Sequence, residues 1–163
     1  MHRDEPRASA WTLAGLFAVA LATLMYEILL TRIFSVTMWY HFAFVAISLA
    51  MFGMAAGALV VFFRPDYFTV ERARYHLALS TVCLAISIVF SFLTHLTIPF
   101  VFSRSLVGLY SMALNFVVAS IPFICSGVCV CLALTKFPRD VSRLYAADLA
   151  GAATGCISSG RRS

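Results

Sequence analysis

The sequence predicts an all-α protein, a polytopic membrane helix bundle with four transmembrane helices and the start of a truncated fifth. Composition is the first reason: 62% of the residues are hydrophobic and 12% are charged, which leaves too few polar side chains to cover a water-soluble domain. The second reason is that the apolar residues form four long stretches. The third is that basic residues gather at alternate ends of those stretches.

The four apolar stretches run over residues 10–30, 42–63, 77–102 and 105–134, and Glu27 is the only charged residue in any of them. A helix rises about 1.5 Å per residue and the hydrocarbon core is about 30 Å thick, so about 20 such residues span a bilayer. Each stretch is long enough, and each is therefore expected to be one transmembrane helix.

Basic residues predict the orientation. If the chain crosses four times, one side of the membrane holds Arg3, Arg7, Arg64, Arg72, Arg74, Lys136, Arg139 and Arg143, and the other side holds Arg32 and Arg104. Positive residues stay on the cytoplasmic side, so we expect a multi-pass protein of the cell inner membrane with a cytoplasmic N-terminus. A cleaved signal peptide is the competing interpretation of the first stretch, because Ala20-Leu21-Ala22 resembles a cleavage site. The apolar run continues well past that point, which favours an uncleaved helix.

The expected organisation has four parts. Residues 1–9 are a cytoplasmic N-terminal tail, 10–134 the four-helix transmembrane domain, 135–145 a cytoplasmic basic loop, and 146–163 an incomplete fifth helix with a polar tail. A helix over residues 146–157 would cover about 18 Å, too little to cross a bilayer. We therefore expect the chain to end in the middle of a fifth helix, as a truncated product would.

Small residues four apart predict where the helices pack, because close backbone approach drives association in lipid. Gly53 and Gly57 form such a pair in the second stretch, and Gly151 and Gly155 form another after the fourth. The first stretch has a row of alanines, so we expect the first two helices to be tight antiparallel neighbours; the row is Ala10, Ala14, Ala18 and Ala22. The short connection around Arg104 predicts that the third and fourth helices form a second antiparallel hairpin.

A stripe of small and polar residues follows one side of the fourth stretch. It is interpreted as a packing seam or, alternatively, as the lining of a substrate path. Its members are Ser111, Asn115, Ala119, Pro122 and Ser126.

Ionisable residues in the outer third of the bundle form the candidate polar cluster. Glu27 lies about 25 Å along the first helix and His95 about 27 Å along the third, so their depths match. Arg32 and Arg104 belong to the same side of the membrane. Charge inside a membrane is costly and marks function or a structural ion pair. The two interpretations, a structural carboxylate and a proton- or cation-coupled site, both remain open for Glu27.

Several other functions are not indicated. The sequence has no glycine-rich nucleotide turn and no Ser/His/Asp arrangement, so we expect no enzyme activity, no catalytic residue and no cofactor. Cys125 and Cys129 could present a thiolate pair to a soft metal, but no further ligand stands at a suitable spacing, so we expect no metal site. The basic residues lie at the ends of the predicted transmembrane helices and not in one stripe, which argues against a nucleic-acid-binding function. The expected partners are the lipid bilayer and other membrane helices, from the same or a different protein.

Three sequence blocks carry a family resemblance. They are Tyr26-Glu27-Ile28-Leu29-Leu30-Thr31-Arg32, residues 48–57 (SLAMFGMAAG) and residues 143–155 (RLYAADLAGAATG). In this order they resemble the N-terminal membrane region of bacterial membrane-bound spermidine-synthase-like proteins, whose transmembrane helices are joined to a cytoplasmic aminopropyltransferase-type domain that binds an S-adenosylmethionine-derived substrate. The matching positions are Glu27, Arg32, Gly53, Gly57, Tyr145, Asp148, Gly151 and Gly155.

The resemblance covers about residues 10–157 and implies a membrane-anchoring region. The family's later helices and its nucleotide-binding domain have no counterpart in this sequence, so no catalytic residue is carried over and the chain is expected to be a fragment without activity of its own. Two alternatives stay open. One is a small proton-coupled exporter, similar in outline to small multidrug resistance transporters, with Glu27 as the coupling residue. The other is a structural membrane subunit.

Overall fold

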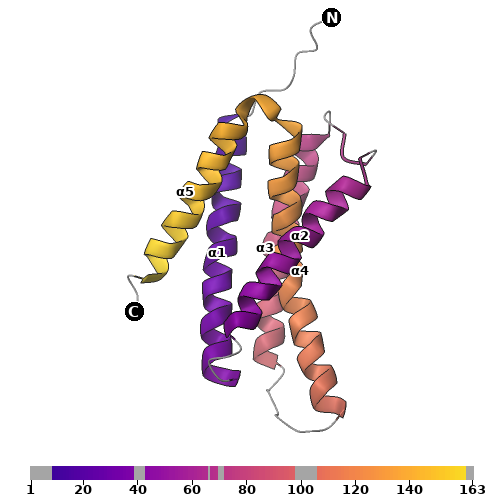
Figure 1. Cartoon of the computed structure of the whole chain (residues 1–163), viewed down its shortest axis with the longest axis vertical. Helices are drawn as coiled ribbons and strands as arrows, with labels where there is room; N and C mark the ends of the chain where they lie inside the picture. Colours follow the sequence, from indigo (N-terminus) through magenta and orange to yellow (C-terminus); the bar gives the residue numbers. More distant parts are fainter. Residues whose placement is uncertain (1–8, 39–42, 66, 70–71, 98–105, 161–163) are drawn as a thin grey trace, which may run out of the picture.

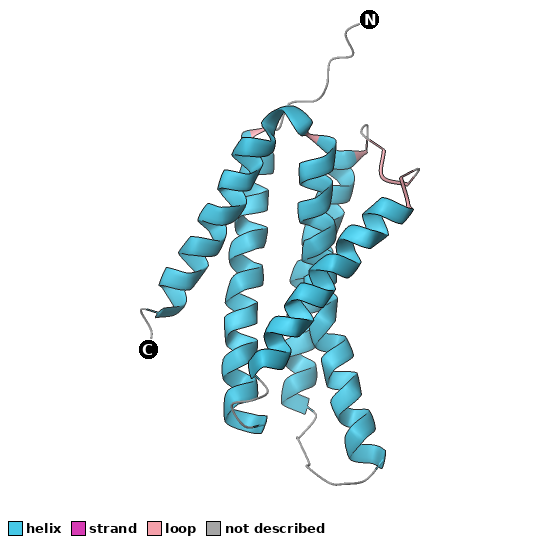
Figure 2. Cartoon of the chain, in the orientation of Figure 1, coloured by secondary structure: helices cyan, strands magenta, loops and turns pink. Residues whose placement is uncertain are grey.

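The computed structural model describes residues 9–38, 43–65, 67–69, 72–97 and 106–160. They form five α-helices and one short 3₁₀ turn, and these residues contain no strand (Figure 2). The elements are α1 (Ala10–Met38), α2 (Ala43–Phe63), α3 (Ala73–Thr97), α4 (Leu106–Lys136), the 3₁₀ turn η2 (Pro138–Asp140) and α5 (Val141–Gly160). The predicted all-α class is confirmed.

Four of the described helices, α1 to α4, are long and apolar enough to cross a membrane, as the sequence predicts. They run alternately up and down the bundle, and α5 turns back from the end of α4 to lie beside α1 (Figure 1). Large apolar side chains such as Phe63, Ile86 and Val117 are exposed on the outside. In water such a surface would be unstable, whereas in a bilayer it faces acyl chains.

The helix ends differ from the expected ones. α1 continues to Met38, well past Leu30, and the expected loop over 135–145 is largely helical. Proline cannot continue the hydrogen-bond ladder of a helix, so α4 ends before Pro138, and α5 begins three residues after it. Phe137 is buried together with Leu144 and fixes this sharp turn between the two helices. The basic residues of the segment are thereby placed on helix ends and not in a loop.

The first two helices are in contact as expected, but α2 meets α1 through Ala46 and Ala50, whereas its glycine pair packs against α4. A methyl group added at Gly53 would lie 2.5 Å from Cβ of Phe123, and one at Gly57 would lie 2.7 Å from the backbone nitrogen of Val128. Gly127 of α4 is equally close to the backbone of Met54. Residues later in α2 contact residues later in α4, so the two helices run parallel where they cross.

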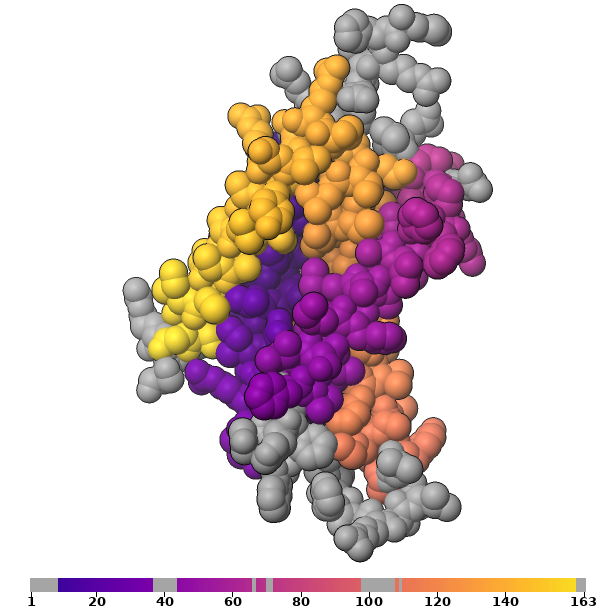
Figure 3. Space-filling view, in the orientation of Figure 1, coloured from indigo at the N-terminus to yellow at the C-terminus, as the bar shows by residue number. Residues whose placement is uncertain are grey.

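The second glycine pair attaches α5 to α1. Gly151 lies against the backbone of Phe17 and the side chain of Ala20, and Gly155 lies against Leu21 and Leu24. This register also rises in one direction, so α5 runs parallel to α1. In the space-filling view α5 covers one side of α1 and α2 crosses on the other (Figure 3).

Most of the predicted alanine row of α1 lies outside the helix contacts. Ala10, Ala14 and Ala18 are exposed, while Ala20, which is outside the row, is buried against α5. The backbone carbonyls of Phe17 and Leu21 and the side chain of Leu24 complete the interface from the α1 side. Small residues on one helix are enough for close approach.

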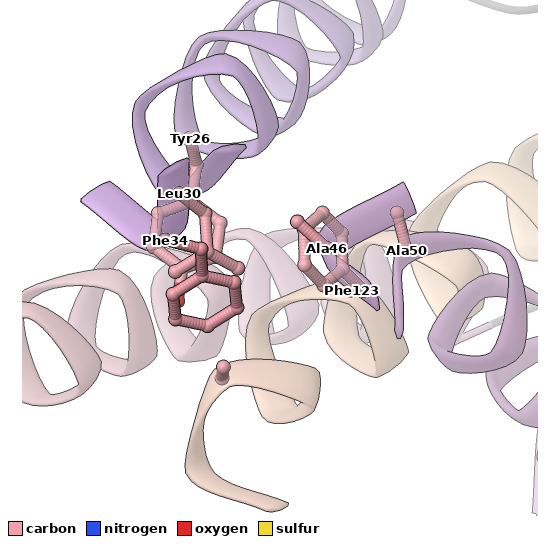
Figure 4. Close-up of a cluster of buried hydrophobic side chains, with 7 residues drawn as sticks. Tyr26, Leu30, Phe34, Ala46, Ala50 and Phe123 are labelled. Atoms are coloured by element: carbon pink, nitrogen blue, oxygen red, sulfur yellow. The ribbon is translucent and has the colours of Figure 1, made fainter. Parts of the chain in front are cut away.

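Aromatic residues fill the centre of the bundle where α1, α2 and α4 meet. Tyr26, Leu30 and Phe34 line up along one face of α1 and pack with Ala46, Ala50, Ala119 and Phe123 (Figure 4). The rings of Tyr26 and Phe123 have centroids 5.3 Å apart, and those of Phe34 and Phe116 are 5.8 Å apart, edge to face. This cluster joins α1, α2 and α4 and includes Tyr26.

Candidate functional site

Glu27 follows Tyr26 on α1 and is half-buried at the flank of the central cluster. Arg32 is exposed five residues further on, about 140° around the helix, so the two side chains point in different directions. In the described part of the chain Glu27 makes no ion pair. A carboxylate in an apolar span without a cationic partner is the most unusual charged group of the molecule.

His95 lies in a separate environment on α3. Its ring meets Phe34 edge to face, with centroids 5.7 Å apart, and it lies next to the side chain of Asn115 on α4. Both ring nitrogens of His95 and the side-chain oxygen of Asn115 are shielded from solvent and make no hydrogen bond of good geometry. Phe34 is two helical turns beyond Glu27, about 10 Å along α1, so His95 faces a different level of that helix.

The residues of the predicted cluster are therefore distributed over several places. Among the described residues, no hydrogen bond or ion pair joins Glu27, Arg32 and His95. Arg32 lines a cleft of about 390 Å³ beside the end of α5, together with Ser158 and Ser159. Arg104 lies outside the described residues.

The centre of the bundle holds two polar contacts that the sequence analysis missed. The hydroxyl oxygens of Tyr26 and Ser91 are 2.7 Å apart and join α1 to α3. The hydroxyl of Thr23 lies 2.8 Å from that of Ser126 and joins α1 to α4. A signal for the first existed, since Tyr26 is the only tyrosine deep inside an apolar stretch, and a buried tyrosine needs a partner for its hydroxyl.

The polar stripe of α4 is mostly buried. Asn115, Ala119, Pro122 and Ser126 all face the interior of the bundle, and the amide nitrogen of Asn115 donates to the carbonyl of Ser111 at 3.0 Å. Ser126 is satisfied by Thr23. The stripe thus contributes to the contacts between α4 and the helices around it, which is what a packing seam does.

Asp148 is the second carboxylate placed against a helix contact. It lies on α5 between the buried residues Leu144 and Gly151, on the side that faces α1, and it is half-buried. Burial raises the pKa of Asp148, because the charged form loses hydration. The described residues supply no ion pair to it.

The cysteines and histidines do not converge. All five cysteines are free, and within the described ranges no three His, Cys, Asp or Glu side chains are grouped as metal ligands. The sulfur of Cys129 lies 3.8 Å from the hydroxyl of Thr81, a contact between α3 and α4. His76 is buried among the rings of Tyr67, Phe68 and Tyr75 next to the start of α3.

The fold and its contacts define a multi-pass helical membrane protein. No protein-family model matches the chain, and no curated protein or solved structure is detectably similar to it. What can be said of its activity therefore rests on its own residues.

Proposed function

We propose that the chain is the membrane-embedded, non-catalytic region of a spermidine-synthase-like protein, held in the cell inner membrane with its N-terminus in the cytoplasm. One observation carries the proposal. The last sequence block of the resemblance, on α5, packs directly on α1, the helix that bears the first block, through Gly151 and Gly155. The middle block supplies Gly53 and Gly57, which pack on α4.

The four motif glycines are thus packing residues, as an anchoring bundle requires, whereas Arg32 and Tyr145 of the motifs are exposed. Tyr26 of the first block also binds Ser91 on α3. None of these contacts forms a pocket of catalytic groups. A role in fixing helices to one another fits a region whose chemistry is carried elsewhere in the protein.

The DNA that follows the codon for Ser163 tests the family proposal. We expect an in-phase frame that encodes further apolar helices and a glycine-rich nucleotide site. A stop codon followed by unrelated genes would contradict it. In parallel, the purified chain in liposomes is expected to show no turnover of decarboxylated S-adenosylmethionine above a lipid-only control, and measurable turnover would contradict the non-catalytic role.

Cysteine labelling in a background without the native cysteines tests the orientation. Single cysteines next to Arg72 and Arg139 are expected to react only with reagents that reach the cytoplasm, because these basic segments lie on the inner side. Labelling of either position from the periplasm would overturn the orientation.

A proton-coupled transporter is the second candidate. It is favoured by the carboxylate of Glu27, which lies within an apolar span and forms no ion pair with any described residue. Proton coupling needs a group that titrates, and glutamine does not. In proteoliposomes with an imposed pH gradient, this candidate requires substrate-dependent proton flux in the wild type and none in Glu27→Gln, with both proteins folded. An anchoring role, which we favour, gives no flux in either protein.

A further inference from the structure

A cleft of about 330 Å³ opens between α1 and α3 near the N-terminal ends of both helices. One end is polar, because Ser9, Thr12 and Arg74 belong to the first turns of the two helices or directly precede them. The other end is mostly apolar and is lined by Leu16, Leu77 and Ala133. Thr81 also lines it, and its hydroxyl donates to the carbonyl of Leu77. Its volume is in the range of ligand sites in proteins, which begins at about 300 Å³.

The polar end of the cleft is positively charged. Arg74 is exposed in the first turn of α3, and among the described residues no carboxylate forms an ion pair with it. The first turns of α1 and α3 also direct their N-terminal N–H groups and positive dipole ends toward this side of the membrane. An anionic group is therefore favoured here over a neutral or cationic one.

The cleft lies at the depth where a lipid headgroup meets its acyl chains. Trp11, which lines it, is 87% exposed one residue inside α1, the position at which indole rings prefer the membrane interface. Below it, the apolar walls belong to two helices that span the bilayer, so the cleft opens to the acyl chains of the surrounding lipid. A polar, cationic upper end and an apolar lower end match a molecule with an anionic head and a hydrocarbon tail.

We propose that this cleft binds an anionic phospholipid from the leaflet next to the N-terminus of α1. The phosphate group binds Arg74 and the first turns of α1 and α3, and one acyl chain lies along Leu16, Leu77 and Ala133. The site does not depend on the proposed family. A second copy of the chain is a less suitable occupant, because an apolar helix would leave the guanidinium of Arg74 without a partner.

Native mass spectrometry of the full chain, released from neutral detergent after titration with defined lipids, tests the site. We expect phosphatidylglycerol to remain bound at lower concentration than phosphatidylcholine. Arg74→Gln should weaken phosphatidylglycerol binding about fivefold, the effect of one basic residue at a membrane surface, and leave phosphatidylcholine unchanged. The matched control is Arg64→Gln, an exposed arginine directly after α2 that does not line the cleft. It should bind as the wild type does.

A second variant tests the apolar part. Ala78 lines the cleft and is exposed, so Ala78→Phe is expected to fold and to exclude the acyl chain, which weakens the binding of both lipids. Equal retention of the two lipids by the wild type, or equal effects of Arg74→Gln and Arg64→Gln, would overturn the proposal. Displacement of phosphatidylglycerol by millimolar inorganic phosphate would show a site for a free anion, and a dimer that excludes the lipid would show a second copy as occupant. Either result would overturn it as well.

Discussion

The contact between α2 and α4 and the contact between α1 and α3 represent two ways of joining helices in lipid. In the first, glycines on both helices bring the backbones together: Gly57 lies against Val128, and Gly127 lies against Met54. In the second, the hydroxyl of Tyr26 reaches Ser91 across the bundle centre. The first contact depends on the absence of side chains and the second on the presence of two particular side chains.

This difference sets how each contact responds to substitution. Any side chain at Gly57 must push the two helix backbones apart, because backbone atoms cannot relieve the clash by changing a side-chain rotamer. A hydroxyl pair loses one hydrogen bond when one partner is removed, and such bonds in membrane proteins contribute on average about 0.6 kcal/mol. The glycine contacts are therefore expected to dominate the stability of the bundle.

The largest expected effect is that of Gly57→Leu. The leucine side chain would occupy the space of the α4 backbone around Val128, which should cost about 3 kcal/mol or more in free energy of unfolding and lower the yield of monodisperse protein in detergent. The control is Leu59→Ala, at a residue of α2 that is 52% exposed. Equal tolerance of the two changes, measured by size-exclusion chromatography and thermal unfolding, would mean that this face of α2 faces lipid.

A smaller loss is expected from Gly151→Ala, which places a methyl group against the carbonyl of Phe17 and within 3.1 Å of Ala20. The change should lower the midpoint of thermal unfolding and increase hydrogen exchange in α5. The matched control is Gly15→Ala on α1, where an added methyl group meets no atom within 4 Å. That variant gains helix propensity worth up to about 1 kcal/mol and should be neutral or more stable. Stabilisation by both changes would show that α5 is not held on α1 through Gly151.

The hydroxyl pair should give a modest coupling. A double-mutant cycle with Tyr26→Phe and Ser91→Ala is expected to yield about 0.6 kcal/mol of interaction energy, and no more than about 1.7 kcal/mol. Each variant is measured by unfolding in mixed detergent. An interaction energy near zero would mean that the hydroxyl pair adds no stability and that the aromatic cluster alone stabilises this region.

The smallest effect concerns Asp148 and pH. Burial raises the pKa of this carboxyl group in the folded protein, so the folded state holds the proton more firmly than the unfolded state. The free energy of unfolding should therefore fall as pH rises from about 4, the unfolded value, through the raised folded value. Asp148→Asn removes this contribution: the variant should be slightly more stable than wild type at pH 7 and equal to it below about pH 4. Identical slopes of the unfolding midpoint against pH in the two proteins would contradict this.

Hydropathy was sufficient to predict the fold class and the four spans, but not where helices end. It reports which residues contact hydrocarbon, whereas a helix continues as long as its backbone hydrogen bonds are made. For this reason α1 continues through Thr31 and Arg32, both polar, to Met38. Pro65 and Pro138 were local signals for a boundary, since α2 and α4 each end two residues before a proline.

Spacing revealed the glycine pairs but not their partners. The spacing of Gly53 and Gly57 predicts a close helix contact. It does not predict the partner, because the flat face that the glycines form fits any helix with a matching surface. On α4 that surface is formed by a lone glycine, Gly127, next to large residues, and no repeat in the sequence points to it. Helical depth likewise placed Glu27 and His95 at one level, because it was counted from residue 77. α3 begins at Ala73, and His95 meets Phe34, two turns beyond Glu27.

The parallel packing of α5 on α1 joins the last described helix to the first. During synthesis α1 enters the membrane before α5 exists, and α2 likewise enters before Gly127 has been made. The α3–α4 hairpin can close at once, because it joins consecutive helices. The face of α1 around Phe17 and Ala20 therefore stays open to lipid, or to the insertion machinery, until α5 has been synthesised. The contact between α1 and α5 is therefore expected to form late in the assembly of the described helices, at a time set by the translation of η2 and α5.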